Sequence, residues 1–136
     1  MLDKECIQSR GFHNVVEHGQ VIGFQVAIRS LYYRGVWLSQ LRPAIVIVDG
    51  ETFSGEQITW TIGGKTYAQS DLVQHPTVNW SLLEPAALTV HKPGGLAQGF
   101  HDIEIQYTYS SSYMPPAMDE LLARLNGPFK RRLILV

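Results

Sequence analysis

Apolar residues alternate with polar or small residues along much of this chain. A period of two is the pattern of a β-strand with one buried face. The clearest case runs from Ile103 to Tyr109, where every second residue is aliphatic or aromatic and the residues between are polar. The same pattern occurs at Ile22–Ile28, Ile58–Ile62 and Val78–Leu82. Each of these segments is predicted to form a strand that packs on one side.

Other segments are predicted to be strands or turns on different grounds. Ala44–Val48 is a continuous apolar run rich in β-branched residues, which indicates a strand buried on both faces. It stops at Asp49-Gly50, and Gly63-Gly64 follows a predicted strand; both dipeptides accept positive φ and are typical of two-residue hairpin turns. Lys92–Leu96 contains Pro-Gly-Gly and is predicted to be a rigid turn. Further strands are predicted at residues 6–16, 65–68, 86–90 and 132–136.

One segment near the end of the chain has the features of a helix. Pro115-Pro116 marks its start, Asp119 and Glu120 lie near its positive N-terminal end, and Asn126-Gly127-Pro128 ends it. About eight short strands spaced by about ten residues, with one late helix, predict an all-β fold. We expect one domain over residues 1–136, an antiparallel β-sandwich (jelly-roll or immunoglobulin-like) with a C-terminal helix and strand at about 115–136. A closed barrel is the alternative.

Composition and charge narrow the range of functions. The net charge is −1 and the basic residues are scattered apart from Lys130-Arg131-Arg132, so nucleic acid is not an expected partner. Met1–Glu5 lacks the pattern of a secretory signal, and no apolar run is long enough to span a membrane. The single Cys6 excludes an internal disulfide and is predicted to be a small buried thiol. A cytoplasmic protein without a membrane partner is therefore expected.

The most unusual stretch is Leu31–Leu38, a connection between strands that is apolar and aromatic where small polar residues are the norm. A second apolar loop segment, Tyr113–Pro116, precedes the predicted helix. Aromatic residues with an arginine among them are typical of interface centres, of ligand stacking, and of an aromatic corner that closes one end of a sandwich. The candidate residues for a partner interface or an active-site rim are Tyr32, Tyr33, Arg34, Trp37, Tyr113 and Met114.

Residues that could carry catalysis or bind metal are present, but their spacing is uninformative. Among the five histidines, His101 comes closest to a metal-ligand spacing, with acids at positions 102 and 104. In a strand these acids share the face opposite to that of His101, so we interpret His101 as a surface or edge histidine beside solvated acids. Trp60 and Trp80 stand at alternating apolar positions and are predicted to be core residues. No catalytic residue, metal ligand or cofactor is assigned to this chain.

The order of several short motifs is informative, although each motif is weak alone. Taken together, they resemble the β subunit of bacterial C-glycoside deglycosidases. The resemblance covers about residues 15–113, whereas the tail at 115–136 carries none of the motifs. The motifs are, in order, Tyr32-Tyr33-Arg34-Gly35, Val48-Asp49-Gly50-Glu51, Ile62-Gly63-Gly64-Lys65-Thr66-Tyr67, Val90-His91-Lys92-Pro93-Gly94-Gly95-Leu96, and Gly99 with the acidic strand after it.

The resemblance implies a small β-sandwich subunit that pairs with a larger catalytic α subunit. In that family the α subunit resembles a sugar-isomerase-type TIM barrel, holds a divalent metal, usually manganese, and carries the acid/base residues. The complex cleaves the carbon–carbon bond between an aromatic aglycone and a sugar oxidised at its 3-position, and that step consumes no external redox cofactor. The resemblance implies a non-catalytic role for this chain, with the candidate residues above packed near the mouth of the α subunit's barrel.

Two other classes of function stay open on the sequence alone. A stand-alone carbohydrate-binding module would stack Tyr32, Tyr33 and Trp37 on sugar rings and would bind sugar without a partner. A self-sufficient jelly-roll enzyme would use His91, His101 and nearby acids around a metal ion. The ordered motifs favour the subunit over both.

Overall fold

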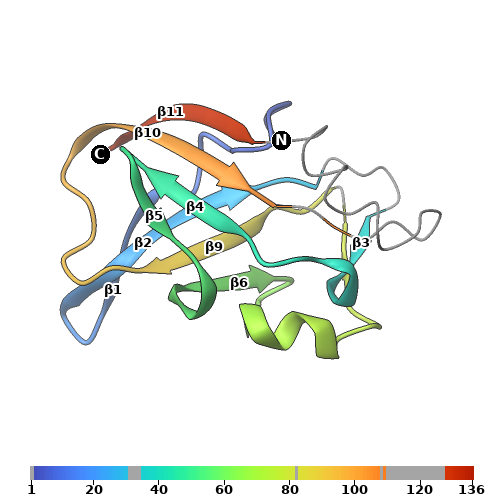
Figure 1. Cartoon of the computed structure of the whole chain (residues 1–136). Helices are drawn as coiled ribbons and strands as arrows, with labels where there is room; N and C mark the ends of the chain where they lie inside the picture. Colours follow the sequence, from blue (N-terminus) through green and yellow to red (C-terminus); the bar gives the residue numbers. More distant parts are fainter. Residues whose placement is uncertain (1, 31–34, 82, 108, 110–127) are drawn as a thin grey trace.

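The computed structural model describes residues 2–30, 35–81, 83–107, 109 and 128–136 (Figure 1). The described strands form two antiparallel sheets packed face to face, with strand orders β1-β2-β9-β6-β7 and β11-β10-β4-β5, and a short third pair, β3-β8. The predicted antiparallel β-sandwich is confirmed, and the two open sheets rule out the closed barrel among the described residues. The strands are β1 (His13–Glu17), β2 (Gln20–Ile28), β3 (Val36–Trp37), β4 (Ile45–Val48), β5 (Glu51–Phe53), β6 (Ile58–Ile62), β7 (Lys65–Ala68), β8 (Asn79–Trp80), β9 (Ala86–His91), β10 (Gly99–Gln106) and β11 (Phe129–Leu135).

Most predicted strands are present, but several boundaries differ. The first strand begins at His13, because the preceding segment instead makes an isolated bridge between Ile7 and Ile28. Of the predicted strand at Val78–Leu82, the described residues form a strand at Asn79–Trp80, and Leu82 lies outside them. Within the described part of the chain, three 3₁₀ helices connect strands: η1 (Leu38–Gln40), η2 (Gly55–Gln57) and η3 (Gln69–Gln74). The predicted C-terminal helix lies outside the described residues, and no helix within them is long and apolar enough to cross a membrane.

The core lies between the two sheets and follows the predicted alternation. Phe24, Trp60, Leu88 and Ile105, from four different strands, are fully buried, as is Trp80. The predictions for Trp60 and Trp80 are therefore confirmed. Burying aliphatic and aromatic side chains of this size supplies the main stabilising contribution of a sandwich core.

Cys6 is also part of this core and is almost fully buried, as predicted. Its Sγ lies 3.7 Å from the carbonyl oxygen of Arg29. Burial disfavours the thiolate and raises the pKa of Cys6 to about 12. The thiol therefore behaves as a small apolar side chain.

The prediction that Ala44–Val48 is buried on both faces is wrong. Val46 and Val48 point into the core, whereas Ile45 and Ile47 point to the outer face of the four-stranded sheet and are only partly buried. β-branched residues pack well on any pleated surface, so such a run specifies a strand without requiring a second covering layer. The outer face of β4 is therefore partly apolar.

The turns follow the predicted chemistry. Asp49 and Gly50 have φ values of 51° and 88° and join β4 to β5, while Gly63 and Gly64, at 61° and 81°, join β6 to β7. In the predicted turn at Lys92–Leu96, the Gly95 N–H donates to the Lys92 carbonyl at 2.8 Å. All three turn predictions are confirmed.

Gly23 occupies a point of very close approach between β2 and β9. Its position pairs with His91, and a Cβ atom built on Gly23 would lie 1.9 Å from the Val90 carbonyl oxygen. The next contact along, from the Lys92 N–H to the Ile22 carbonyl oxygen, is 2.9 Å. Only glycine leaves space for this approach, because the obstacle is backbone rather than a movable side chain.

Candidate functional site

Trp37 is the one predicted interface residue that the structure describes. It ends β3, its side chain is exposed (43% for the residue), and its backbone N–H donates to Gln40 Oε1 at 3.0 Å. Its neighbour Val36 is buried and pairs with Trp80. The indole therefore lies at the surface on an anchored backbone, and its role in an interface stays a prediction. The candidates outside the described residues are Tyr32, Tyr33, Arg34, Tyr113 and Met114.

Beneath this end of the sandwich lies an aromatic cluster of Trp60, Trp80, Tyr107 and Phe129. The ring centroids of Trp60 and Trp80 are 5.7 Å apart with an edge-to-face angle of 76°, and Tyr107 lies 5.8 Å from Trp80 and 5.7 Å from Phe129. The polar atoms of the cluster have partners: for example, Trp80 Nε1 donates to the Glu84 carbonyl oxygen at 2.8 Å. Aromatic packing with satisfied polar atoms holds Trp80 of β8 in place and, through its pairing with Val36, the short strand β3.

Gln69, in η3, ties the aromatic cluster to the neighbouring loops. Its side chain is almost fully buried, and its Oε1 accepts hydrogen bonds from the Ala44 N–H at 2.7 Å and Trp60 Nε1 at 3.0 Å. Its Nε2 donates to the carbonyl oxygens of Ala44 at 3.2 Å and Gly55 at 3.0 Å. These contacts use the full capacity of the amide, with two accepted and two donated hydrogen bonds. One side chain thus links the residue before β4, the middle of β6 and the first residue of η2.

Gly35 is the first described residue after the aromatic segment 31–34, and its surroundings are restrictive. Its φ is +74°, and a Cβ atom would lie 2.6 Å from Asn79 Oδ1 and 2.9 Å from the Trp80 carbonyl oxygen. The chain therefore joins β8 here through a conformation and a contact that both require glycine.

His101 is buried on the inner face of β10, so its interpretation as a surface histidine is wrong. Its Nδ1 lies 2.6 Å from Asp49 Oδ2 and its Nε2 lies 2.7 Å from the Ala97 carbonyl oxygen. Both partners can only accept, Asp49 as a carboxylate and Ala97 through its carbonyl, so the imidazolium form, in which both ring nitrogens donate, is the form that satisfies both contacts. Metal coordination by His101 would require the loss of one of these hydrogen bonds.

Asp49 links this histidine to the backbone of β10. Its Oδ1 accepts the Asp102 N–H at 2.9 Å. Partial burial of the ring opposes the charged form, but the hydrogen bonds to Ala97 and Asp49 and the charge of Asp49 outweigh it and raise the pKa of His101 above 6.5. The same hydrogen bond, with that from Asp102, lowers the pKa of Asp49 below 3.8.

The ion pair between His101 and Asp49 should make stability depend on pH. A histidine pKa that is raised in the folded chain stabilises the fold below about pH 6.5, and this contribution is lost as the pH rises through the raised value. The lowered pKa of Asp49 acts oppositely, with stability lost as the pH falls below about 3.8. Between about pH 6 and about pH 9, we expect the free energy of unfolding to fall by about 1 kcal/mol more than in Asp49→Asn.

The Asp49→Asn variant removes the charge and tolerates the positive φ of this turn. Its single amide oxygen can keep the hydrogen bond from the Asp102 N–H, and its Nδ2 then takes the place of the oxygen that faces His101 Nδ1. Urea titrations at several pH values measure the difference. Asp102 and Arg132, which also lie near Asp49, are unchanged in both proteins. Equal pH slopes for the two proteins would contradict the role assigned to the ion pair.

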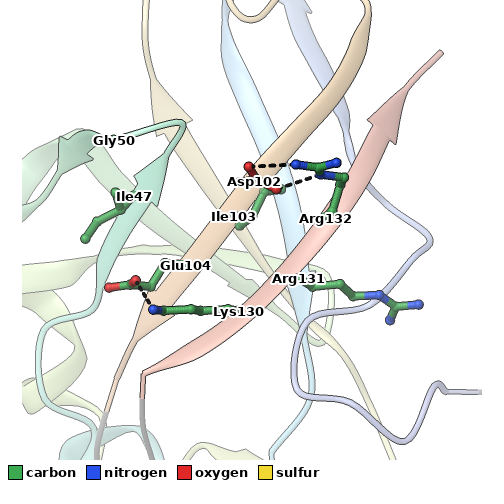
Figure 2. A pocket seen from close by; sticks show the side chains of 8 residues that line it. All are labelled: Ile47, Gly50, Asp102, Ile103, Glu104, Lys130, Arg131 and Arg132. Atoms are coloured by element: carbon green, nitrogen blue, oxygen red, sulfur yellow. Dashed lines mark hydrogen bonds and ion pairs between the residues drawn. The ribbon is translucent and has the colours of Figure 1, made fainter.

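The acids at 102 and 104 lie on the outer face of the four-stranded sheet, as expected (Figure 2). Asp102 pairs with Arg132 at 2.8 and 3.2 Å, and Glu104 pairs with Lys130 at 3.6 Å. The hydrogen bond from Arg132 lowers the pKa of Asp102. Among the described residues, no group of three or more His, Cys, Asp or Glu side chains could hold a metal ion.

Comparison with known proteins identifies the family. A model of the C-glycoside deglycosidase beta subunit family matches residues 2–113. The chain is 43% identical over 120 residues to the C-glycoside deglycosidase beta subunit of Eubacterium cellulosolvens, covering 88% of this chain and 82% of that protein. The chain belongs to the C-glycoside deglycosidase beta subunit family. A second relative, the protein of the same name from Arthrobacter globiformis, is 25% identical over 104 residues, covering 74% of this chain and 79% of that protein.

Within this family assignment, the motifs that carried the sequence resemblance have structural roles. Asp49-Gly50 and Gly63-Gly64 form hairpin turns, and Gly95 lies where a Cβ atom would clash with the Asn14 side chain. Asn14 in turn exchanges two hydrogen bonds of 2.9 Å with the backbone of Leu96. The family match reaches further toward the N-terminus than the sequence resemblance and stops before β11.

The structure also shows a link that sequence reasoning missed. His101 and Asp49 are 52 positions apart, and the nearer acids draw attention away from the true partner. The available signal was the Asp49-Gly50 turn, whose aspartate side chain lies free to accept hydrogen bonds beside a strand end. Gln69 gave no comparable signal, because a lone glutamine in a polar connection is usually exposed.

Proposed function

We propose that this chain is the β subunit of a C-glycoside deglycosidase and acts as an accessory, non-catalytic partner in a hetero-oligomer in the cytoplasm. Membership of the beta subunit family carries this proposal, since both relatives bear that name and each is matched over more than two thirds of its length. The partner is a larger α subunit with a TIM-barrel fold that holds a divalent metal ion, manganese in our proposal.

The proposed reaction of the complex is a carbon–carbon lyase reaction on a 3-oxo-glucosyl C-glycoside of an aromatic aglycone. The 3-oxo group acidifies the proton on the adjacent carbon 2, and a metal ion bound to the α subunit would polarise that carbonyl. A base removes the proton, the bond from carbon 1 to the aryl carbon breaks, and the aryl carbon takes up a proton. Oxidation state is unchanged overall, so this step needs no redox cofactor.

The proposed contribution of this chain is contact with the α subunit near the mouth of its barrel. The exposed indole of Trp37, anchored through Val36 and Trp80, supports this assignment. The rings of the aromatic cluster beneath Trp37 are packed and hydrogen-bonded, which supports a structural role for this end of the sandwich rather than a catalytic one. His101 is a poor candidate for a general base, since both of its nitrogens already contact hydrogen-bond acceptors within the chain.

Co-expression with the protein encoded beside this chain tests the proposal directly. We expect a larger complex that contains metal and cleaves a 3-oxo C-glycoside, whereas this chain alone should be inactive. Arg34→Ala should weaken assembly or lower turnover of the complex, because arginine is among the residues that dominate interface energetics. Cleavage by this chain alone, or failure to associate with its neighbour, would refute the proposal; unchanged assembly and turnover in Arg34→Ala would remove Arg34 from the interface.

Gly35→Ala should impair assembly more than Arg34→Ala does. The new methyl group meets Asn79 Oδ1 and the Trp80 carbonyl oxygen, and its positive φ adds strain, so the start of β3 must move. We expect a loss of about ten-fold or more in affinity for the α subunit. Gly64→Ala is the matched control, since its φ is +81° but nothing lies within 4 Å of its Cβ position. Equal effects of the two substitutions would contradict this role for Gly35.

A stand-alone carbohydrate-binding module is the second candidate, favoured by the exposed ring of Trp37. Aromatic faces stack on sugar rings without needing a second subunit. Calorimetric titration of the isolated chain with glucosides distinguishes the two candidates, because only the module binds sugar alone.

A further inference from the structure

The outer face of β10 and β11 carries three cross-strand pairs that are all exposed or partly exposed, and Figure 2 draws the two charged pairs. Phe100 is 70% exposed and its pair Ile134 is 53% exposed. A hollow of about 520 Å³ lies over this face, with Ile47 of β4 at its side. We call this surface the β10–β11 face; its pairs are Phe100 with Ile134, Asp102 with Arg132, and Glu104 with Lys130.

This face differs from an ordinary solvated sheet face in two ways. Large apolar side chains, Phe100 and Ile134, stand exposed next to each other, and such patches mark interaction surfaces. Its acids and bases are equal in number and sorted by strand, acids on β10 and bases on β11. The family match covers β10, whose acids belong to the last of the motifs, and stops before β11, so the basic strand of this face lies outside the match.

The edge of the same sheet is already occupied. β11 is the edge strand, and its Arg131 points away from the Asp102–Arg132 pair toward the N-terminal segment (Figure 2). There Arg131 Nη1 contacts the Ile7 carbonyl oxygen at 2.7 Å and Asp3 Oδ2 at 3.0 Å. Addition of another strand at this edge would have to displace these contacts, so a partner fits the face better than the edge.

We infer that the β10–β11 face binds a second copy of this chain, face to face, around a two-fold axis parallel to the strands and between β10 and β11. Such an axis places β10 of one copy over β11 of the other and leaves the position of each residue along the strand direction unchanged. Residues paired across β10 and β11 lie at the same position along the strands. Asp102 therefore faces Arg132 of the second copy, Glu104 faces Lys130, and Phe100 faces Ile134. Each charged contact across the interface is therefore between opposite charges.

The charge pattern also selects this axis over the other simple choice. A two-fold axis perpendicular to the strands would place β10 over β10 and β11 over β11. Acids would then lie over acids and bases over bases, which opposes association. Net charge on the face is zero with Asp102, Glu104, Lys130 and Arg132 ionised, so two copies approach without overall repulsion.

The size of the face predicts a weak contact. The two strands, about 4.8 Å apart and about six residues long, cover roughly 200 Å² in projection. Stable interfaces bury roughly 800 Å² on each partner. We therefore expect a dissociation constant on the order of 100 µM for the isolated chain. In the complex proposed above, the same contact would join two β subunits; the inference itself does not depend on that proposal.

Sedimentation velocity of the isolated chain, from about 1 µM to about 500 µM, tests the inference. The wild type should pass from monomer to dimer over this range. Arg132→Asp puts acids over acids and should weaken the dimer at least about ten-fold. The double variant Asp102→Arg, Arg132→Asp swaps the charges, keeps both the internal and the intermolecular pairing, and should dimerise like the wild type.

Two further variants complete the design. Lys92→Glu breaks the exposed ion pair with Glu51 (3.3 Å), which lies away from the β10–β11 face, and should leave the dimer unchanged. Phe100→Asp should weaken the dimer without removing an ion pair, and it decides the question if Arg132→Asp does not fold. A monomer at every concentration, or a dimer indifferent to both face substitutions, overturns the inference. So does loss of binding to the co-expressed larger subunit in Arg132→Asp when the chain alone is monomeric, since that subunit would then occupy the face.

Discussion

Gly23→Ala is expected to leave little or no folded protein. A Cβ atom at this position would lie 1.9 Å from the Val90 carbonyl oxygen, 2.9 Å from the Val90 carbonyl carbon and 3.0 Å from the Lys92 nitrogen. These are backbone atoms at the centre of the five-stranded sheet, so β2 and β9 would have to separate. Overpacking usually costs about 1–3 kcal/mol, and a collision with backbone should reach or exceed the top of that range.

Soluble yield and the urea midpoint of whatever folds measure the effect of Gly23→Ala. Gly50→Ala provides a control: nothing lies within 4 Å of its Cβ position, and its φ of +88° costs only about 1–2 kcal/mol. A Gly23→Ala protein as stable as Gly50→Ala would show that β2 and β9 do not approach as closely as the structure describes.

Gln69→Leu is expected to destabilise the chain by about 3–5 kcal/mol, since each buried polar group left without a partner costs about 1–3 kcal/mol. The substitution leaves the indole N–H of Trp60 and the N–H and carbonyl groups of Ala44 without their hydrogen-bond partner. Leucine has a similar volume, so the loss comes from unsatisfied hydrogen bonds rather than from a cavity.

Urea denaturation measures this loss, and the side-chain N–H resonance of Trp60 reports on the broken hydrogen bond. Gln57→Leu is the control, because Gln57 is exposed and its Oε1 accepts a hydrogen bond of 3.3 Å from the Ser54 N–H. Exposed substitutions usually change stability by less than about 0.5 kcal/mol. If Gln69→Leu were as mild as Gln57→Leu, water would have to reach the Gln69 site.

The sequence was informative wherever a structural property depends on near neighbours. Alternation predicted β2, β6 and β10, and the dipeptides Asp49-Gly50 and Gly63-Gly64 predicted their turns, because strand faces and turn dihedrals are set by adjacent residues. Burial of Ile45 and Ile47 was predicted wrongly, since local sequence does not reveal whether a second layer covers a sheet.

Properties that depend on strand order were not predictable. The order β1-β2-β9-β6-β7 brings β2 beside β9, and nothing local in either strand specifies that pairing. For the same reason the partner of His101 was missed, and the central role of Gln69 was not foreseen. Of the predicted interface residues, Trp37 is exposed as a contact residue must be, and the others stay predictions from sequence.

Burial of Cys6 has a practical consequence for experiments on this protein. Thiol reagents attack the thiolate, and with a pKa of about 12 only about one Cys6 in ten thousand is ionised at pH 8. Cys6 in the natural chain therefore reacts very slowly with maleimides and thiol-reactive spin labels, and it need not be replaced before a labelling experiment. A single cysteine introduced at Trp37 or Phe100 would carry the label alone, so that one probe could report on a larger partner and the other on a second copy.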